Sequence, residues 1–365
     1  LLYAVCFSCV VALFDAELDP LVHGGRRAVA RGEAAPAALN AALAFALTAR
    51  PGGDFTLRLP SPHRPALVVR AGRESARFDP LSSAASPMAG EGPNGVLTRF
   101  HGELLLPAAV GRPLVAALGV AMLTLVITGV VLHRKWLAEL FTVRLYRSRR
   151  LRWADLHRSA GLWGLPFHAM IAFTGAALGF SSYALVAAVL TSTGGDQAAA
   201  MTAMGMNPPK TTPSTSADAP PALPLAELLA RAAAGLPDFT PETIEVSGYG
   251  APDGAAEAFG HLPGRLVYYP SVTVSTATGA GMRGTDWCRE SWGRRLYALA
   301  TPLHYASYGG FWLKALYAVL GTGGCFMAIS GLRLLRLRPG GEAGGLARFG
   351  VGVVWGLPAA TAALF

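Results

Sequence analysis

Long apolar blocks constrain this chain more than any other feature, because about 20 apolar residues suffice to cross a lipid bilayer as a helix. Three interior blocks reach that length, and apolar blocks also occupy both ends of the sequence. Of the 365 residues, 52% are hydrophobic and only 15% are charged, which is too apolar for an ordinary soluble enzyme. The pattern predicts a membrane α-helical bundle with four core transmembrane helices and a possible fifth.

The helices leave two long polar segments and two short basic ones. We interpret the apolar start of the chain as a truncated helix, since it is too short to span and lacks the basic region and cleavage site of a signal peptide. The expected boundaries are 1–14 for helix 1, 15–106 for the first outside segment, 107–133 for helix 2, 134–157 for a basic loop, 158–190 for helix 3, 191–303 for the second outside segment, 304–335 for helix 4, 336–347 for a second short loop and 348–365 for a possible truncated helix 5.

The distribution of charge predicts the orientation of the bundle. Segment 133–158 holds eight Lys and Arg against two acids, and 333–348 holds four against one. The long segments 15–106 and 191–303 together hold 17 basic and 19 acidic residues. Short loops rich in Lys and Arg stay in the cytoplasm, so the long segments are expected on the opposite side. The pI near 9.7 reflects this topology and does not indicate a nucleic-acid partner.

An internal duplication relates the two halves of the chain. Segments 100–136 and 303–338 each open with an apolar residue and His, reach an Ile-Thr/Ser-Gly triplet, and end on basic residues. The outside segments also correspond, because each contains an Ala-rich helical stretch followed by alternating extended runs. We therefore expect two small α+β domains outside the membrane.

Five of the eight histidines lie at or inside the predicted helices: His101, His133, His157, His168 and His304. His157 and His168 are eleven residues apart, which places them on one helix face and about 16 Å apart along the axis. A histidine at the membrane edge, such as His133, is about as often a simple polar cap at the interface as it is a ligand. A histidine at the depth of His168 is a functional candidate by default.

Single histidines on separate helices suit a flat cofactor that is held from above and below, and haem with two axial imidazoles is such a cofactor. Zinc would require ligands close in sequence, and no such spacing occurs. Glycines on helices 3 and 4 would leave room for a porphyrin, although small-residue helix packing explains any one of them equally well. The sequence has no Cys-x-x-Cys-His, so covalent haem c is excluded.

Three stretches resemble a known family: "ITGVVLHRKWLAELFTVR", "DLHRSAGLWGLPFHAMIAFTGA" and "LHYASYGGFWLKALYAVLGTGGCFMAISG". They are similar to the PepSY-associated transmembrane family, in its iron-regulated inner-membrane branch of ferric-siderophore reductases. The resemblance implies a bacterial inner-membrane protein with two periplasmic PepSY-like domains. It implies b-type haems, two in number, bound through His101, His133, His157, His168 and His304. The family's first helix usually opens with a further histidine that this sequence lacks.

The resulting hypothesis is a transmembrane reductase with two haems. His133, His157 and His168 would serve a cytoplasmic-side haem, and His101 and His304 a periplasmic-side haem, with His168 able to serve either. Electrons would come from a cytoplasmic reductant or quinol and pass to a ferric siderophore or other ferric chelate in the periplasm. The aromatic residues near the outer edge are candidates for the substrate surface, although interfacial anchoring is the more common role; they are Trp287, Trp292, Tyr305 and Tyr308.

Two other functions stay open. The first is a haem-free membrane module that binds or regulates a peptidase or a peptide through its outside domains. The second is a metal-ion transporter that uses the histidines as transient sites. A transporter would need acidic partners inside the helices, and the cores of helices 2 to 4 contain no Asp or Glu.

Overall fold

The structure of the chain is a computed structural model that forms two compact units. Unit 1 comprises Leu1–Leu18, Glu91–Leu185 and Ala300–Phe365, and unit 2 comprises Asp19–Gly90 and Val186–Leu299. The residues described are 1–15, 17–18, 32–61, 65–87, 92–132, 144, 146, 148–196, 199, 222–263, 270–285, 292–337 and 345–365.

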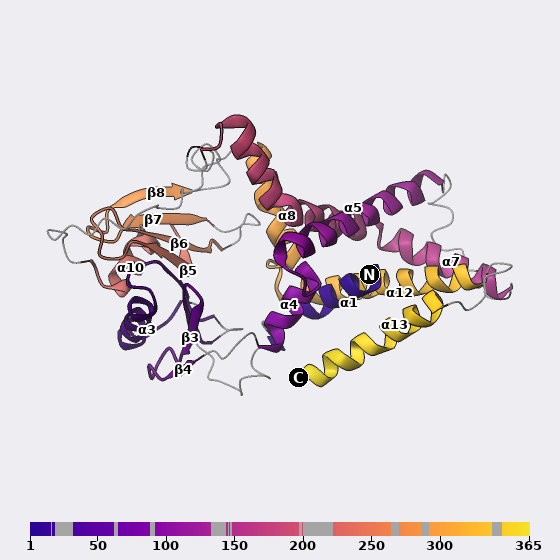
Figure 1. Cartoon of the computed structure of the whole chain (residues 1–365), viewed down its shortest axis with the longest axis horizontal. Helices are drawn as coiled ribbons and strands as arrows, with labels where there is room; N and C mark the ends of the chain where they lie inside the picture. The colour runs from indigo at the N-terminus through magenta and orange to yellow at the C-terminus, as the bar shows by residue number, and fades with distance from the viewer. Residues whose placement is uncertain are drawn as a thin grey trace. The chain divides into compact units, whose positions relative to one another are not determined.

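Unit 1 is helical (Figure 1). Its elements are α1 (Leu2–Ala12), α4 (Pro93–Glu103), α5 (Ala108–Leu132), α7 (Arg149–Trp163), most of α8 (Leu165–Ser192), the end of α11 (Trp292–Tyr305), α12 (Gly310–Arg336) and α13 (Gly345–Leu364). The helix α12 packs against α1, α7 and α13, and α4 packs against α1 and α5. Helices from both sequence halves therefore share one bundle.

Three helices in the described part of the chain are long and apolar enough to cross a membrane: α5, α8 and α12. They correspond to the predicted helices 2, 3 and 4, so that part of the prediction is confirmed. The helix α1 and residues Arg348–Leu364 of α13 are apolar but shorter. The chain is a membrane helical protein with an additional β region.

The predicted third helix, 158–190, is divided in two, which corrects its expected start. The helix α7 is capped at Gly164, and α8 begins at Leu165 with Pro166 in its first turn. Proline is tolerated there because the first N–H groups of a helix have no intrahelical partner. A Cβ atom at position 164 would overlap the His168 ring, so glycine is needed at this junction.

Small residues allow α5 and α8 to approach closely. A Cβ added at Gly179 would lie 2.7 Å from the Cβ of Ala116, and one at Gly119 would lie 3.0 Å from the carbonyl oxygen of Ala172. Lipid gives little hydrophobic drive for helix association, so close backbone packing of this kind holds membrane helices together.

Unit 2 contains one antiparallel sheet of eight strands in the order β4-β3-β2-β1-β5-β6-β7-β8. The strands are β1 (Phe55–Arg58), β2 (Leu67–Ala71), β3 (Glu74–Phe78), β4 (Ala85–Pro87), β5 (Thr240–Ser247), β6 (Ala255–His261), β7 (Ser271–Ser275) and β8 (Gly281–Thr285). The helices α3 (Pro36–Ala49) and α10 (Leu225–Ala234) share a single core with the apolar face of this sheet.

The prediction of two separate outside domains is corrected in one respect. Each outside segment does form a helix followed by antiparallel strands, as expected, and the structure shows four strands in each. The two sets join through β1 and β5, where Leu57 lies opposite Ile244, and both residues are fully buried. An unpaired strand edge exposes backbone hydrogen-bonding groups, so pairing β1 with β5 satisfies two edges at once and extends the core.

Parts of the two expected outside segments belong to the helical unit. The helix α4, which lies within the expected outside segment 15–106, belongs to unit 1 and carries His101. The last turns of α11, which carry His304, belong to unit 1 as well. Both histidines are therefore part of the helical unit.

Candidate functional site

The rings of His101 and His304 form a pair inside unit 1. Their centroids are 6.0 Å apart and their planes are inclined by 31°. The two residues come from α4 and α11, which occupy matching positions in the internal duplication. The structure thus brings together the two histidines that the sequence suggested as partners on the outer side.

The hydrogen bonds of His101 determine which ring nitrogen carries its proton. Its Nδ1 lies 3.2 Å from the carbonyl oxygen of Val5 and 3.2 Å from the Ser8 hydroxyl oxygen, both on α1. A carbonyl oxygen can only accept, so Nδ1–H is the donor and the neutral ring keeps its lone pair on Nε2. That nitrogen is the one available to a metal.

The same arrangement recurs at His304. Its Nδ1 lies 3.0 Å from the Thr174 hydroxyl oxygen on α8, and that hydroxyl donates to the carbonyl oxygen of Met170 at 2.8 Å. Because the hydroxyl proton is directed to Met170, Nδ1–H of His304 is the donor and Nε2 again keeps the lone pair. A Cβ added at Gly175 would lie 3.0 Å from the His304 ring, so glycine allows this contact.

The spacing of this pair would allow both rings to hold one metal ion. Imidazole nitrogens bind metals at about 2 Å and lie about 1 Å from their ring centre, so two rings bound to one metal would have centres up to about 6 Å apart. The observed centroid distance is 6.0 Å. Metal-bound histidines usually donate their other N–H to a protein acceptor, and both rings do so here. The donor set therefore suits a haem iron.

His157 shows the same hydrogen-bonding pattern at the other end of unit 1. Its Nδ1 lies 2.8 Å from the Ser330 hydroxyl oxygen on α12, which donates to the carbonyl oxygen of Met327 at 3.1 Å. Here too Nε2 keeps the lone pair. His133, which the sequence suggested together with His157 and His168 for the same haem, lies outside the described residues.

His168 is arranged differently from the other three rings. Only 1% of it is exposed, and its Nε2 lies 3.2 Å from the carbonyl oxygen of Leu320 on α12. Nε2–H must therefore donate, and the unprotonated Nδ1 has no hydrogen-bond partner in the structure. Its Nε2 is used in a helix contact rather than left for a metal. The assignment of His168 as a haem ligand stays a prediction.

The expected common face of His157 and His168 persists across the break between α7 and α8, because both rings contact α12. Their partners there, Ser330 and Leu320, are ten residues apart, which corresponds to about 15 Å of helix rise. Along α8, Thr174 lies six residues from His168, or about 9 Å. The histidine contacts therefore occur at three depths that together cover most of an apolar core of about 30 Å.

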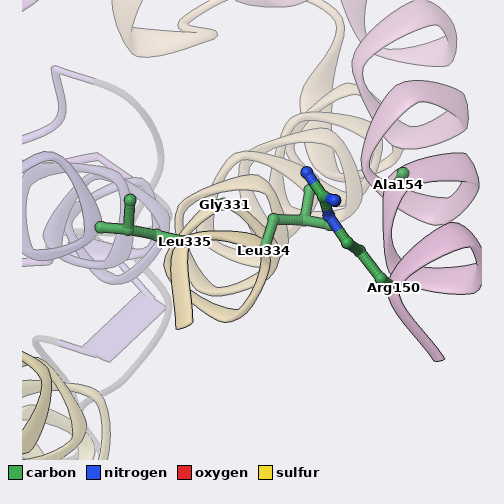
Figure 2. A pocket seen from close by; sticks show the side chains of 5 residues that line it. All are labelled: Arg150, Ala154, Gly331, Leu334 and Leu335. Atoms are coloured by element: carbon green, nitrogen blue, oxygen red, sulfur yellow. The ribbon is translucent and has the colours of Figure 1, made fainter. Parts of the chain in front are cut away.

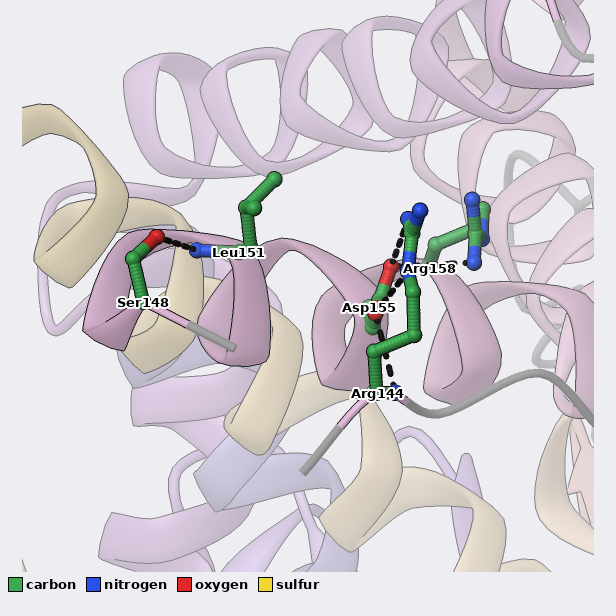
Figure 3. A network of polar contacts seen from close by, with 5 residues as sticks. All are labelled: Arg144, Ser148, Leu151, Asp155 and Arg158. Carbon is green, nitrogen blue, oxygen red and sulfur yellow. Dashed lines mark hydrogen bonds and ion pairs between the residues drawn. The ribbon is translucent and has the colours of Figure 1, made fainter. Parts of the chain in front are cut away.

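A buried carboxylate anchors the helix that carries His157 (Figure 3). Asp155 is 1% exposed and accepts hydrogen bonds from Arg144 at 2.8 and 2.9 Å and from Arg158 at 3.0 Å. These bonds, above all those from the Arg144 side chain, lower the pKa of Asp155 to about 2. The network ties the segment before α7 to the helix itself.

We expect Asp155→Asn to lower the free energy of unfolding by about 2 kcal/mol at pH 7, the value of a carboxyl pKa lowered by between one and two units. A depressed carboxyl pKa stabilises the fold above the unfolded pKa of about 4. This contribution is lost as the pH falls through the folded value of about 2. Thermal unfolding of both proteins in detergent across pH 2 to 7 measures it, and the difference should shrink towards pH 2.

A suitable control for this prediction is Glu227→Gln. Glu227 pairs with Arg231 on α10 at 2.8 Å, but both side chains are more than 40% exposed. Such a pair contributes only a few tenths of a kcal/mol. Equal effects of the two substitutions would contradict the anchoring role of Asp155.

The sequence interpretation missed the hydroxyl partners Ser8, Thr174 and Ser330. Ser330 lies in the Ile-Ser-Gly triplet of the internal duplication, so a signal was present, and Thr174 lies in a similar Phe-Thr-Gly triplet. Ser8 has no comparable sequence context. Of the candidate aromatic residues, Trp292 and Tyr305 are 75% and 55% exposed, and Trp287 lies outside the described residues. In the described part of the chain, no group of three or more His, Cys, Asp or Glu could hold a bare metal ion.

The protein belongs to the class of helical membrane proteins that also contain a β domain. Its helical unit holds the paired histidines, and its second unit holds the antiparallel sheet. Residues 1–338 match the family described as "PepSY-associated TM region", and the chain belongs to that family. The chain is also 30% identical over 282 residues to a Pseudomonas aeruginosa protein named "Uncharacterized protein PA4219". The matched region covers 74% of this chain and 71% of the relative.

Proposed function

We propose that this protein is a b-type haem oxidoreductase that passes electrons through the membrane and reduces ferric chelates, such as ferric siderophores, on the side opposite its basic loops. The observation that carries the proposal is the His101–His304 pair, with ring centroids 6.0 Å apart. Both rings direct Nδ1–H to protein acceptors, which leaves Nε2 for iron.

The residues of the chain have defined tasks in this function. His101 and His304 would hold one haem, and His157 would hold a second with a partner outside the described residues. Haem iron, when bound, supplies one-electron transfer at a potential set by its ligands and surroundings. The hydroxyls of Ser8, Thr174 and Ser330 orient the rings and fix their tautomers.

The depths of the histidines support transfer across the membrane rather than along one surface. The contact of His157 and that of His168 are separated by about 15 Å along α12, and His304 contacts α8 about 9 Å from His168. His168 lies between the two ends, fully enclosed by the bundle.

The substrate side of the proposal rests on iron chemistry and on one exposed aromatic residue. Reduction turns Fe(III) into Fe(II), which hard oxygen ligands hold more weakly, so the chelate releases its iron. No acid, base or nucleophile from the protein is needed. Tyr305 is 55% exposed, and its ring centroid lies 5.5 Å from that of His304. A chelate that contacts Tyr305 would therefore approach the outer histidine pair.

A spectroscopic experiment tests the proposal. The purified full chain is expected to be coloured and to show a b-type α-band when reduced with dithionite. The band should disappear when ferric chelate is added without oxygen, and the amount of Fe(II) formed should equal the amount of haem oxidised. A colourless preparation would contradict the proposal and favour a haem-free binding module. A reduced band that ferric chelate leaves unchanged would contradict the assigned substrate.

A further inference from the structure

A groove at the basic end of unit 1 lies between the start of α7 and the last turns of α12. Its volume is about 470 Å³, within the range of small-molecule sites. Arg150, Ala154, Gly331, Leu334 and Leu335 line it (Figure 2). The haem function proposed above does not use these side chains.

The charge of this groove comes from Arg150. Its guanidinium extends from α7 towards α12 in Figure 2, and it has no ion-pair partner among the described residues. Asp155, the one acid on α7, is already bound to Arg144 and Arg158. The same two helix segments carry further arginines, which do not line the groove: Arg149, Arg152, Arg333 and Arg336.

The walls of the groove are apolar and open to the surroundings. Leu335 is 50% exposed, and Leu334 is partly exposed. Both lie in the last turns of a membrane-spanning helix, where lipid headgroups meet the hydrocarbon core. Trp153, with Arg333 stacked 4.5 Å above its ring, marks the same level, because aromatic and basic residues collect at this interface.

We propose that the groove between α7 and α12 binds an anionic phospholipid, with the lipid phosphate on Arg150 and the start of an acyl chain along Leu334 and Leu335. Guanidinium groups bind phosphate through paired charge-assisted hydrogen bonds. Basic pockets between membrane helices are typical sites for acidic headgroups. The occupant is a phospholipid rather than a free anion because the apolar walls need an apolar partner.

The chemistry of the lining disfavours a quinol as the occupant. A quinol must give up its hydroxyl protons when it is oxidised, so its site needs an acceptor. Arg150 has only donors, and the other lining side chains are apolar or absent. A phosphodiester is instead a pure acceptor and complements the guanidinium.

Bound lipid would also stabilise the candidate haem site. Gly331 lines the groove and follows Ser330, whose hydroxyl holds His157. A lipid that bridges α7 and α12 would hold these two helices together at that contact. Anionic lipid is therefore expected to raise the thermal stability of the protein.

The test uses the purified full chain in detergent micelles that contain either phosphatidylglycerol or phosphatidylcholine with the same acyl chains. Native mass spectrometry counts the lipids retained, and thermal unfolding gives the stabilisation. Wild type is expected to retain phosphatidylglycerol and to unfold at a higher temperature in it. Arg150→Gln should bind it about fivefold more weakly, since each arginine near an anionic surface contributes a similar factor. Arg150→Lys should retain part of the effect.

The matched control is Arg149→Gln, which removes an equally exposed neighbouring charge on the same helix but does not line the groove. It should keep the stabilisation of the wild type. Equal losses in Arg149→Gln and Arg150→Gln would overturn the site in favour of diffuse attraction. Equal stabilisation by phosphatidylcholine, by inorganic phosphate alone, or by a short-chain quinol would overturn the anionic lipid as the occupant.

Discussion

His304→Ala is expected to lose the haem held by the His101–His304 pair, with the reduced α-band per chain falling by about half, as for loss of one of two haems. A non-covalent haem depends on its axial bonds, and His304 supplies one of them in our proposal. Its ring lies 6.0 Å from that of His101, so His101→Ala should give the same loss. A pyridine haemochrome assay on equal amounts of purified protein measures the haem content.

The pair of variants also provides an internal check. His101→Ala combined with His304→Ala should lose no more haem than either alone, because both act on one haem. His261→Ala, on β6 of the sheet unit, is the control and should keep the full haem content. Unchanged haem in His101→Ala and His304→Ala would defeat the assignment of this pair.

Thr174→Val is expected to weaken haem binding at the outer site by about 10- to 100-fold, the usual cost of removing the hydrogen-bond partner of a metal-bound histidine. In the wild type, the Thr174 hydroxyl oxygen lies 3.0 Å from Nδ1 of His304 and accepts its hydrogen bond. Valine matches threonine in shape but has no acceptor for this N–H. The ring would lose its orientation and part of its basicity, so the reduction potential should also shift upwards. Haem titration and potentiometric spectroscopy measure the two effects.

Two further variants separate the positioning role of Thr174 from a role in packing alone. Thr174→Ser restores the hydroxyl and should recover both the affinity and the potential. Thr322→Val is the matched control, because Thr322 on α12 also donates to a carbonyl of its own helix, at 2.8 Å, but is exposed. A potential that stays at the wild-type value in Thr174→Val would contradict the positioning role.

The sequence predicted the spanning helices well because the signal is local. The length of an apolar run decides whether a segment can cross a bilayer, and α5, α8 and α12 each satisfy that condition within one stretch of chain. The start of α8 was misplaced because the run continues through Gly164 and Pro166. Only the packing of the His168 ring against position 164 shows why the helix is interrupted there.

The joined sheet was beyond a reading of the sequence. Residues 55–58 and 243–246 are nearly two hundred positions apart, and each segment has the pattern of an ordinary half-buried strand. Nothing in either strand specifies that its partner lies in the other half of the chain. The duplication correctly indicated two similar modules, but two similar modules can stay separate or share one sheet.

The sequence identified the candidate histidine ligands but not the hydroxyl groups that contact them, and the reason is physical. Ser and Thr in membrane helices commonly bond to a carbonyl of their own preceding turn, and Thr174, Thr128 and Thr322 all do so. Only the approach of His304 from another helix distinguishes Thr174 from the others. That contact is tertiary and leaves no trace in spacing.

The most direct test of the central claim is electron paramagnetic resonance of the oxidised, purified protein. If His101 and His304 share one iron, the wild type shows low-spin ferric signals of bis-imidazole haem, and His304→Ala converts to high spin or removes the part of them that comes from this haem, while any second haem keeps its own signal. A low-spin signal that His304→Ala and His101→Ala both leave unchanged, or a protein with no ferric haem signal, would contradict the account.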